Sequence, residues 1–205
     1  METLHDTCTA SADLRRPRPR AKAVLRLRAL RHADRSALQR FLHGVDEADL
    51  RLRFHAAVSR GSEALATELT RHDGHSRLAL AVVAARPGRS DELLAVLNVA
   101  RSGARAEWAV LVRSDLKGRG LGTFLLDELL RRAARLGIHE LHAETLAGNH
   151  RLLALARRFG HAVSSSSDGT SALTRVLAAK PADPEAETCS TALAGTTRAA
   201  SRSLQ

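Results

Sequence analysis

Three glycines at alternate positions, Gly118, Gly120 and Gly122, mark the part of the chain whose residue types most clearly suggest chemistry. They separate an apolar run from the longest amphipathic pattern, so they stand where a strand turns into a helix. Glycine permits a tight turn and leaves backbone N–H groups accessible, and such groups at a helix start bind phosphate. Lys117 and Arg119 would add positive charge. The segment Lys117-Gly118-Arg119-Gly120-Leu121-Gly122 therefore predicts a phosphate-binding turn, with a purely structural turn as the alternative.

A strand and an amphipathic helix are expected on either side of this turn. Residues 106–113 are expected to form a strand, in which side chains alternate between the two faces, so Glu107 and Trp108 lie on opposite faces. Leucines repeat at helical spacing over 121–136, and Gly137 is typical of a helix C-terminus. The turn is neither a Walker loop nor a Rossmann fingerprint, because no Gly-Lys-Ser/Thr follows and the GxGxxG spacing is not met.

The other apolar patterns predict a mixed α/β domain. Alternating or short apolar runs indicate strands, and leucines at helical spacing behind a capping residue such as Asp34 indicate helices. The expected order implies an α/β (α+β) fold, a mixed sheet with helices on both faces. The remaining strands are expected at 24–30, 78–84, 93–99, 138–146 and 170–177, and the remaining helices at 36–42, 46–54, 62–69 and 149–159.

Length and composition fit one globular domain with two tails. The chain has 205 residues, of which 44% are hydrophobic and 26% charged, values that argue against general disorder. Residues 1–21 form a basic, polar leader and 179–205 a tail without periodicity, so a domain at 22–178 is expected, with both ends disordered. No apolar run reaches the roughly 20 residues of a membrane helix, and no signal peptide is recognised, so a cytoplasmic location is expected.

The formal charge of +10 invites a nucleic-acid-binding interpretation, which other features oppose. Aromatic residues are 2% of the chain and tyrosine is absent, so the stacking surfaces of single-strand binders are missing. No metal site is expected either, because Cys8 and Cys189 lie in the two tails and His139 and His142 lack a third ligand.

The strand and turn together resemble a known family. The run Val110-Leu111-Val112-Arg113, followed by Lys117-x-x-Gly120-x-Gly122, is similar to motif A of the GNAT superfamily of acyl-CoA-dependent N-acyltransferases. That motif usually reads [Q/R]-x-x-G-x-[G/A], so lysine is a conservative departure at its first place. The resemblance implies acetyl-CoA as the donor, a mainly antiparallel GNAT-like sheet, and pantetheine bonded like an added strand to the backbone of Val110, Leu111 and Val112.

A second motif follows at the expected distance. Residues 149–161 resemble motif B of the family, usually N-x-x-A-x-x-L-Y-E-K-x-G-F, with matches at Asn149, Leu155 and Gly160. Asn149 is a candidate acetyl-CoA contact, although its place at a helix start would also explain it as an N-cap. The motif's tyrosine, which often protonates the departing thiolate, is replaced by Ala156, so either water acts or the thiolate leaves without help.

A narrower resemblance joins two earlier segments. The segments Asp49-Leu50-Arg51-Leu52-Arg53-Phe54-His55 and Ala106-Glu107-Trp108-Ala109-Val110 resemble the acetyltransferase domain of Pat-type bacterial protein-lysine acetyltransferases. The resemblance therefore implies a primary amine as the acceptor, either a protein lysine or a small amine. Arg51 and Arg53 have two interpretations, acceptor-site residues or a solvated helix face, and the second is favoured. The oligomeric state is left open.

The resemblance also implies an acid on the strand before the phosphate turn as general base. A lysine amine of pKa about 10.4 costs roughly 4.6 kcal/mol to present neutral at pH 7, and a nearby carboxylate can accept its proton. Glu107 is the first candidate, and Glu144, on the next strand beside His142, is the second. The predicted function is an acetyl-CoA-dependent N-acetyltransferase acting by direct transfer in a ternary complex. The alternative is a non-catalytic module that binds acyl-CoA or a protein partner.

Overall fold

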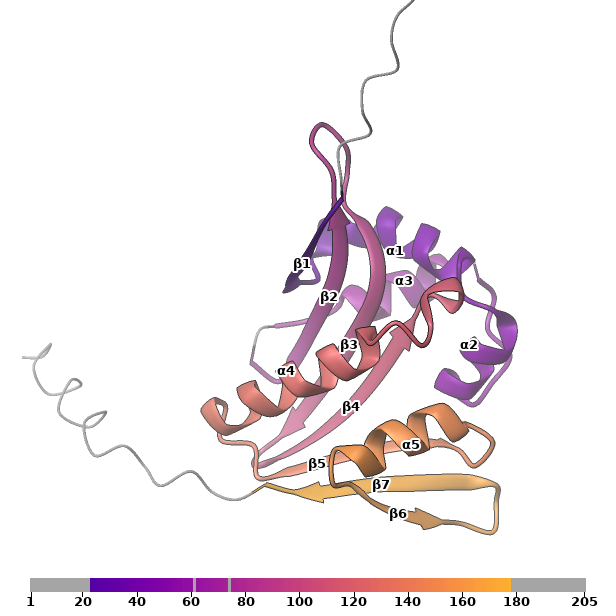
Figure 1. The fold of residues 1–205 in the computed structure, drawn as a ribbon, viewed down its shortest axis with the longest axis vertical. Coiled ribbons are helices and arrows are strands. Elements are labelled where there is room, and N and C mark those ends of the chain that lie inside the picture. The colour runs from indigo at the N-terminus through magenta and orange to yellow at the C-terminus, as the bar shows by residue number, and fades with distance from the viewer. Residues whose placement is uncertain (1–22, 61, 74, 178–205) are drawn as a thin grey trace, which may run out of the picture.

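Seven strands form one sheet in the computed structural model, which describes residues 23–60, 62–73 and 75–177 (Figure 1). Their order in the sheet is β1-β2-β3-β4-β5-β7-β6, and neighbours run antiparallel except for the parallel pair β4 and β5. The mixed, mainly antiparallel sheet is therefore confirmed. The strands are β1 (Val24–Ala29), β2 (Arg77–Ala85), β3 (Glu92–Ser102), β4 (Arg105–Val112), β5 (Glu140–Leu146), β6 (Ala162–Ser165) and β7 (Thr170–Val176).

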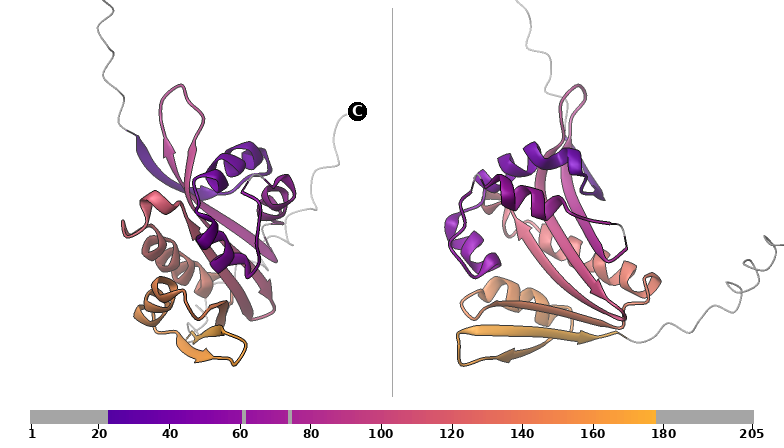
Figure 2. Two further views of the ribbon diagram at one scale, coloured as in Figure 1. Left: turned by 90° about the vertical axis from the view of Figure 1, so that its right-hand side faces the viewer. Right: turned by 180° about the vertical axis from the view of Figure 1, so that it is seen from behind.

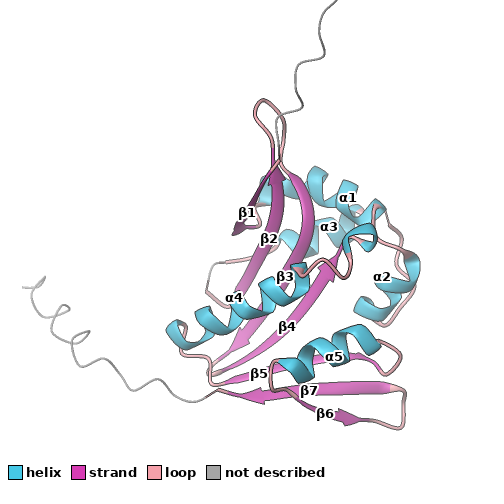
Figure 3. Ribbon diagram, in the orientation of Figure 1, coloured by secondary structure: helices cyan, strands magenta, loops and turns pink. Residues whose placement is uncertain are grey.

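Helices cover both faces of this sheet, as expected (Figure 3). Two helices, α4 and α5, lie on the face toward the viewer in Figure 1, and three, α1, α2 and α3, lie on the face seen from behind in Figure 2. The helices are α1 (Arg35–His43), α2 (Glu47–Phe54), α3 (Glu63–Thr70), α4 (Leu121–Arg135) and α5 (His150–Arg158). Two short 3-10 turns, His32–Asp34 and Ser114–Leu116, precede α1 and follow β4.

Each face of the sheet has its own hydrophobic core. On the α4 and α5 side, Trp108 packs with leucines such as Leu125 and Leu129. On the side of α1–α3, Leu111 packs with a second group that includes Leu38. Residues 108 and 111 stand on opposite faces of β4, so the alternation expected for this strand is confirmed.

The sequence analysis did not predict strand β6, and it assigned Asp34 a role in capping α1 that the side chain does not have. β6 was not predicted because its residues are mostly exposed and rich in serine, so they carry no apolar alternation. Asp34 stands before α1 as expected, yet no cap bond forms from its side chain. Its carboxylate instead accepts two hydrogen bonds from Arg28, at 2.6 and 2.9 Å. Ser62, by contrast, caps α3 through its hydroxyl.

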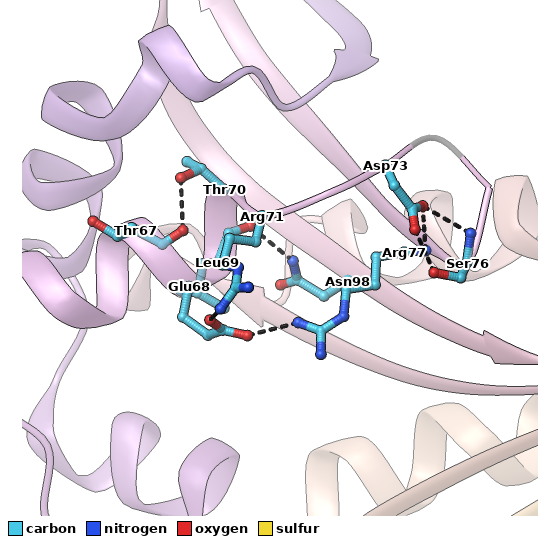
Figure 4. Close-up of polar contacts among 9 residues, drawn as sticks. All are labelled: Thr67, Glu68, Leu69, Thr70, Arg71, Asp73, Ser76, Arg77 and Asn98. Carbon is cyan, nitrogen blue, oxygen red and sulfur yellow. Dashed lines mark hydrogen bonds and ion pairs between the residues drawn. The ribbon is translucent and has the colours of Figure 1, made fainter.

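Polar contacts join the end of α3 and Asp73 to the sheet (Figure 4). Arg77 donates to the carboxylate of Glu68 at 2.7 Å, and Asn98 donates to the carbonyl of Leu69 at 3.2 Å. The carboxylate of Asp73 accepts the backbone N–H of Arg77 and of neighbouring residues, which holds the pKa of Asp73 well below its ordinary value. These bonds hold α3 against β2 and β3, on the face opposite α4.

The leader and tail expected at 1–21 and 179–205 lie outside the described residues, as do Cys8 and Cys189. Within the part of the chain that is described, no helix combines the length and the apolar character needed to cross a bilayer. Helix α4, the longest of that part, has 15 residues.

Candidate active site

The sheet divides where β4 and β5 part. The two strands pair at only three positions, from Arg105 opposite Glu140 to Glu107 opposite His142. β4 continues to Val112 paired only with β3, and β5 continues to Leu146 paired only with β7. The C-terminal halves of these two parallel strands diverge (Figure 1). The backbone N–H and C=O groups that face the division therefore have no partner in a neighbouring strand.

A cleft of about 980 Å³ occupies this division. Its walls come from β4 and β5, from the start of α4, from α5, and from α2 on the far side. Among the residues selected from the sequence, the cleft is lined by Val110, Leu111, Val112, Lys117, Gly118, Gly120, Leu121, Gly122, Glu144 and Asn149. Arg119 and Glu107 are not among the lining residues. The structure therefore brings nearly all the predicted donor-binding residues to one cavity.

The glycine turn has the backbone that its sequence predicts. Gly118 and Gly120 have φ values of 76° and 84°, a left-handed conformation that favours glycine, and Gly120 is the N-cap of α4. The first bond of the helix runs from the N–H of Phe124 to the carbonyl of Gly120. The N–H groups of Leu121, Gly122 and Thr123 therefore have no acceptor in their own helix, and they lie at its positive end beside the cleft.

Gly122 serves a different purpose from the other two glycines. A Cβ placed on it would lie 3.4 Å from Cδ2 of Leu155 and 4.0 Å from Cγ2 of Val112. A Cβ on Gly118 or Gly120 would meet nothing within 4 Å. Gly122 thus allows α4 to approach α5 and β4, whereas the other two allow the turn itself.

Lys117 does not extend freely toward the turn. Its ammonium forms an ion pair with Asp49 of α2, whose side chain is 12% exposed. Asp49 also accepts the hydroxyl of Ser114, and that hydroxyl accepts the backbone N–H of Asp46 at 2.8 Å. Asp49 was named only within the Pat-like segment and Ser114 not at all, because their contact joins segments far apart along the chain. Arg119 is exposed.

Asn149 caps helix α5, as one of its two sequence-based interpretations predicted. It is the N-cap of α5, and its side-chain oxygen accepts the N–H of Leu152 at 3.2 Å. Its side-chain nitrogen donates to the hydroxyl of Thr145 at 2.9 Å. Asn149 thereby joins the end of β5 to the start of α5 while lining the cleft. The capping bond alone explains an asparagine here.

The two candidate bases stand on different parts of the site. Glu144 is exposed and lines the cleft from β5. Glu107 is exposed on β4, on the face turned toward α2, and its charge acts on Arg53. Ala156, at the place of the family's tyrosine, is fully buried. Within the described residues, no three His, Cys, Asp or Glu side chains gather as a metal site would require.

Arg53 corrects one expectation from the sequence. Arg51 is exposed, as expected for a solvated helix face, but Arg53 is half-buried and lines the cleft together with Leu52. Its guanidinium lies 4.7 Å from the ring centre of Phe54. Burial lowers the pKa of Arg53, and the negative charge of Glu107 opposes that effect. The solvated-face interpretation is therefore wrong for Arg53, because α2 turns this side chain toward the division between β4 and β5.

His161 and Trp108 form a buried pair beside the cleft. Their ring centres are 5.3 Å apart in an edge-on arrangement, and both side chains are at most 4% exposed. Nδ1 of His161 lies 3.2 Å from the carbonyl of Ala156, while Nε2 has no hydrogen-bond partner among the described residues. Burial lowers the pKa of His161, the hydrogen bond to Ala156 partly offsets this, and the charge of Arg175 lowers it further. His161 is therefore neutral at pH 7.

Comparison with known families agrees with this geometry. Residues 36–161 match the model of the acetyltransferase (GNAT) family. That range includes the glycine turn, α5 and the whole division between β4 and β5.

Solved structures and curated relatives that are similar to this chain include other acetyltransferases. The GNAT domain of S. lividans PAT has a TM-score of 0.66 and 27% identity, covering 77% of this chain and 97% of that domain. The yncA protein of Salmonella typhimurium, solved with its cofactor acetyl-CoA, has a TM-score of 0.57 and 19% identity, covering 77% and 96%. The L-methionine sulfoximine/L-methionine sulfone acetyltransferases of Pseudomonas aeruginosa and Pseudomonas paraeruginosa are 41% identical over 58 residues, or 28% of this chain. The match spans 34% of the length of these relatives.

Proposed function

The chain belongs to the acetyltransferase (GNAT) family, and from that premise we propose that it is an acetyl-CoA-dependent N-acetyltransferase acting on a primary amine. The observation that carries the proposal is the cleft between β4 and β5, because it combines two features in one cavity. One is the set of unbonded N–H groups at the start of α4, and the other is the unpaired edge of β4. Together they suit a ligand with a phosphate end and an extended amide-bearing arm.

The proposed donor site uses backbone groups more than side chains. The pyrophosphate lies at the N–H groups of Leu121, Gly122 and Thr123, where the helix dipole favours negative charge. The pantetheine arm lies along Val110–Val112, whose unpaired edge supplies donors and acceptors in the manner of an added strand. Lys117 contributes by holding the turn to α2, since Asp49 already binds its ammonium.

The proposed reaction is direct transfer between two bound substrates. The acceptor ammonium gives its proton to Glu107, directly or through a water molecule, and the neutral amine attacks the thioester carbonyl carbon. A C–N bond forms, the C–S bond breaks, CoA leaves as a thiolate, and the nitrogen releases its second proton to solvent as the amide forms. Because Ala156 is buried and carries no acid, solvent protonates the thiolate after it leaves. Glu144, which lines the cleft from β5, is the alternative proton acceptor.

Two acceptor classes have support. The motif resemblance to Pat-type protein-lysine acetyltransferases, together with the similarity to the GNAT domain of S. lividans PAT, favours a protein lysine. The match to the methionine sulfoximine acetyltransferases favours a small amine. A non-catalytic acyl-CoA-binding module is the alternative function, supported by the missing tyrosine at position 156.

Turnover distinguishes these functions. Purified protein is mixed with acetyl-CoA and with either protein substrates or a panel of small amines, and free thiol is measured over time. Acetyl-CoA binding is followed in parallel through the fluorescence of Trp108, the single tryptophan, which lines the cleft. Thiol release that depends on an amine supports the enzyme. Binding without release for any amine would contradict it and support the non-catalytic module.

A further inference from the structure

Arg53 presents a positive charge inside the cleft. It comes from the last turn of α2, which lies across the ends of β4 and β5 on the side opposite α4 and α5. The side chain is half-buried and lines the cavity. This is the side on which Glu107 stands, away from the start of α4 that suits phosphate.

Within residues 23–60, 62–73 and 75–177, no carboxylate forms an ion pair with this guanidinium. Among the described residues, Arg53 has no ion pair within 4.0 Å and no side-chain hydrogen bond. Its guanidinium lies over the ring of Phe54. The carboxylate of Glu107 is close enough to act on it electrostatically but does not contact it. A partly desolvated guanidinium with no hydrogen-bonded anion is unfavourable, so a ligand that supplied an anion would bind favourably at this place.

On the basis of the proposed function, we propose that Arg53 binds the carboxylate of an amino-acid acceptor, whose amino group then faces Glu107. Arginine is suited to this role because its planar fork can donate two parallel hydrogen bonds to one carboxylate. An α-amino acid carries a positive amine and a negative carboxylate a few ångströms apart. It therefore complements a site in which Arg53 and Glu107 stand near each other without touching.

This arrangement distinguishes an amino acid from a lysine side chain. The amine of a protein lysine stands at the end of an apolar chain, with no carboxylate attached near it, so it would leave Arg53 without an anion. The other free cations on the cleft wall, Arg151 and Arg158, lie on α5, on the donor side of the sheet. Arg53 is the cation on the α2 wall that could select the acceptor.

The test compares an acid with its neutral derivative. L-methionine sulfone and its methyl ester each carry an α-amino group on the same side chain, but only the first carries a carboxylate; a lysine peptide with blocked ends is the third acceptor. We expect kcat/KM to favour the acid over the ester by at least tenfold in the wild type. Arg53→Gln should lower the value for the acid by roughly 10- to 100-fold and bring the acid-to-ester ratio near one. Arg53→Lys, which keeps the charge without the fork, should give an intermediate ratio.

Arg51→Gln is the matched control, since it removes the same charge from the same helix at an exposed position. It should leave the acid-to-ester ratio unchanged. Equal fractional losses for acid and ester in Arg53→Gln, or a wild type that acetylates only the lysine peptide, would overturn the role of Arg53 and leave the proposed function standing. A wild type that binds acetyl-CoA but acetylates none of the three acceptors or the wider amine panel would overturn the proposed function itself.

Discussion

The ammonium of Lys117 and the carboxylate of Asp49 form an ion pair that joins the residue before the glycine turn to helix α2. Lys117 can either hold the turn through this ion pair or bind phosphate itself, and the two roles predict opposite effects of an Asp49 substitution on the KM for acetyl-CoA. If the pair holds the turn in place, Asp49→Asn should raise the KM for acetyl-CoA by about fivefold, the equivalent of about 1 kcal/mol. If Lys117 instead binds phosphate, neutralising Asp49 would release the ammonium and lower that KM.

A double-mutant cycle completes this test. Lys117→Met and the double variant are measured under the same conditions, and we expect the two single changes to be strongly non-additive because they break one contact. Additive losses would show that Lys117 acts on the ligand independently of Asp49.

We expect a substitution at Gly120 to weaken acetyl-CoA binding, and a substitution at Gly169 serves as the control. Gly120→Ala places a side chain at a φ of 84°, which costs roughly 1–2 kcal/mol of stability. It also brings a methyl group to the cleft beside the N–H groups of α4. Gly169→Ala meets the same backbone cost at a φ of 83° in the turn before β7, outside the cleft. Calorimetry should therefore show weaker acetyl-CoA binding only for Gly120→Ala, and equal affinities would place the phosphate site elsewhere.

Glu107 and Glu144 can be separated by their pH profiles. If Glu107 accepts the acceptor's proton, Glu107→Gln should lower kcat by roughly 10²–10⁴ near neutral pH. The deficit should shrink as pH rises toward the pKa of the amine, because solvent then supplies the neutral nucleophile. Glu144→Gln, measured with the same amine, should change kcat less. A larger and pH-dependent loss in Glu144→Gln would transfer the role to β5.

Because His161 is buried, we expect the folded protein to lose stability at acid pH. Burial lowers its pKa below the ordinary 6.5, so the unfolded chain binds a proton that the folded protein does not. The contribution to stability is therefore present above about pH 6.5 and is lost as pH falls below it, by at most about 1.4 kcal/mol per pH unit. Urea unfolding of His161→Phe should show a smaller loss between pH 6.5 and 5.5. His139→Gln, at an exposed position, should follow the wild type.

Local patterns predicted the glycine turn and the strand that line one part of the cleft, whereas long-range contacts determine the wall that α2 forms. The glycine turn and α4 follow from residues that are adjacent in sequence, so spacing and periodicity sufficed. The burial of Arg53 depends on where α2 lies relative to β4, and the contact of Lys117 depends on α2 as well. Neither follows from residue types along one segment. β6 escaped notice for a related reason, since its pairing with β7, rather than its own exposed serines, makes it a strand.

The early parting of β4 from β5 has a mechanical consequence. Three residue pairs are all that join the strands β1–β4 to the strands β5–β7 within the sheet, so the two parts share few backbone hydrogen bonds. A donor bonded to β4 on one side and packed against α5 on the other would bridge them like an eighth strand. We therefore expect the empty protein to unfold over a broader temperature range than the loaded one, with the β5–β7 part exchanging its amide hydrogens independently until acetyl-CoA couples the two parts into one cooperative unit.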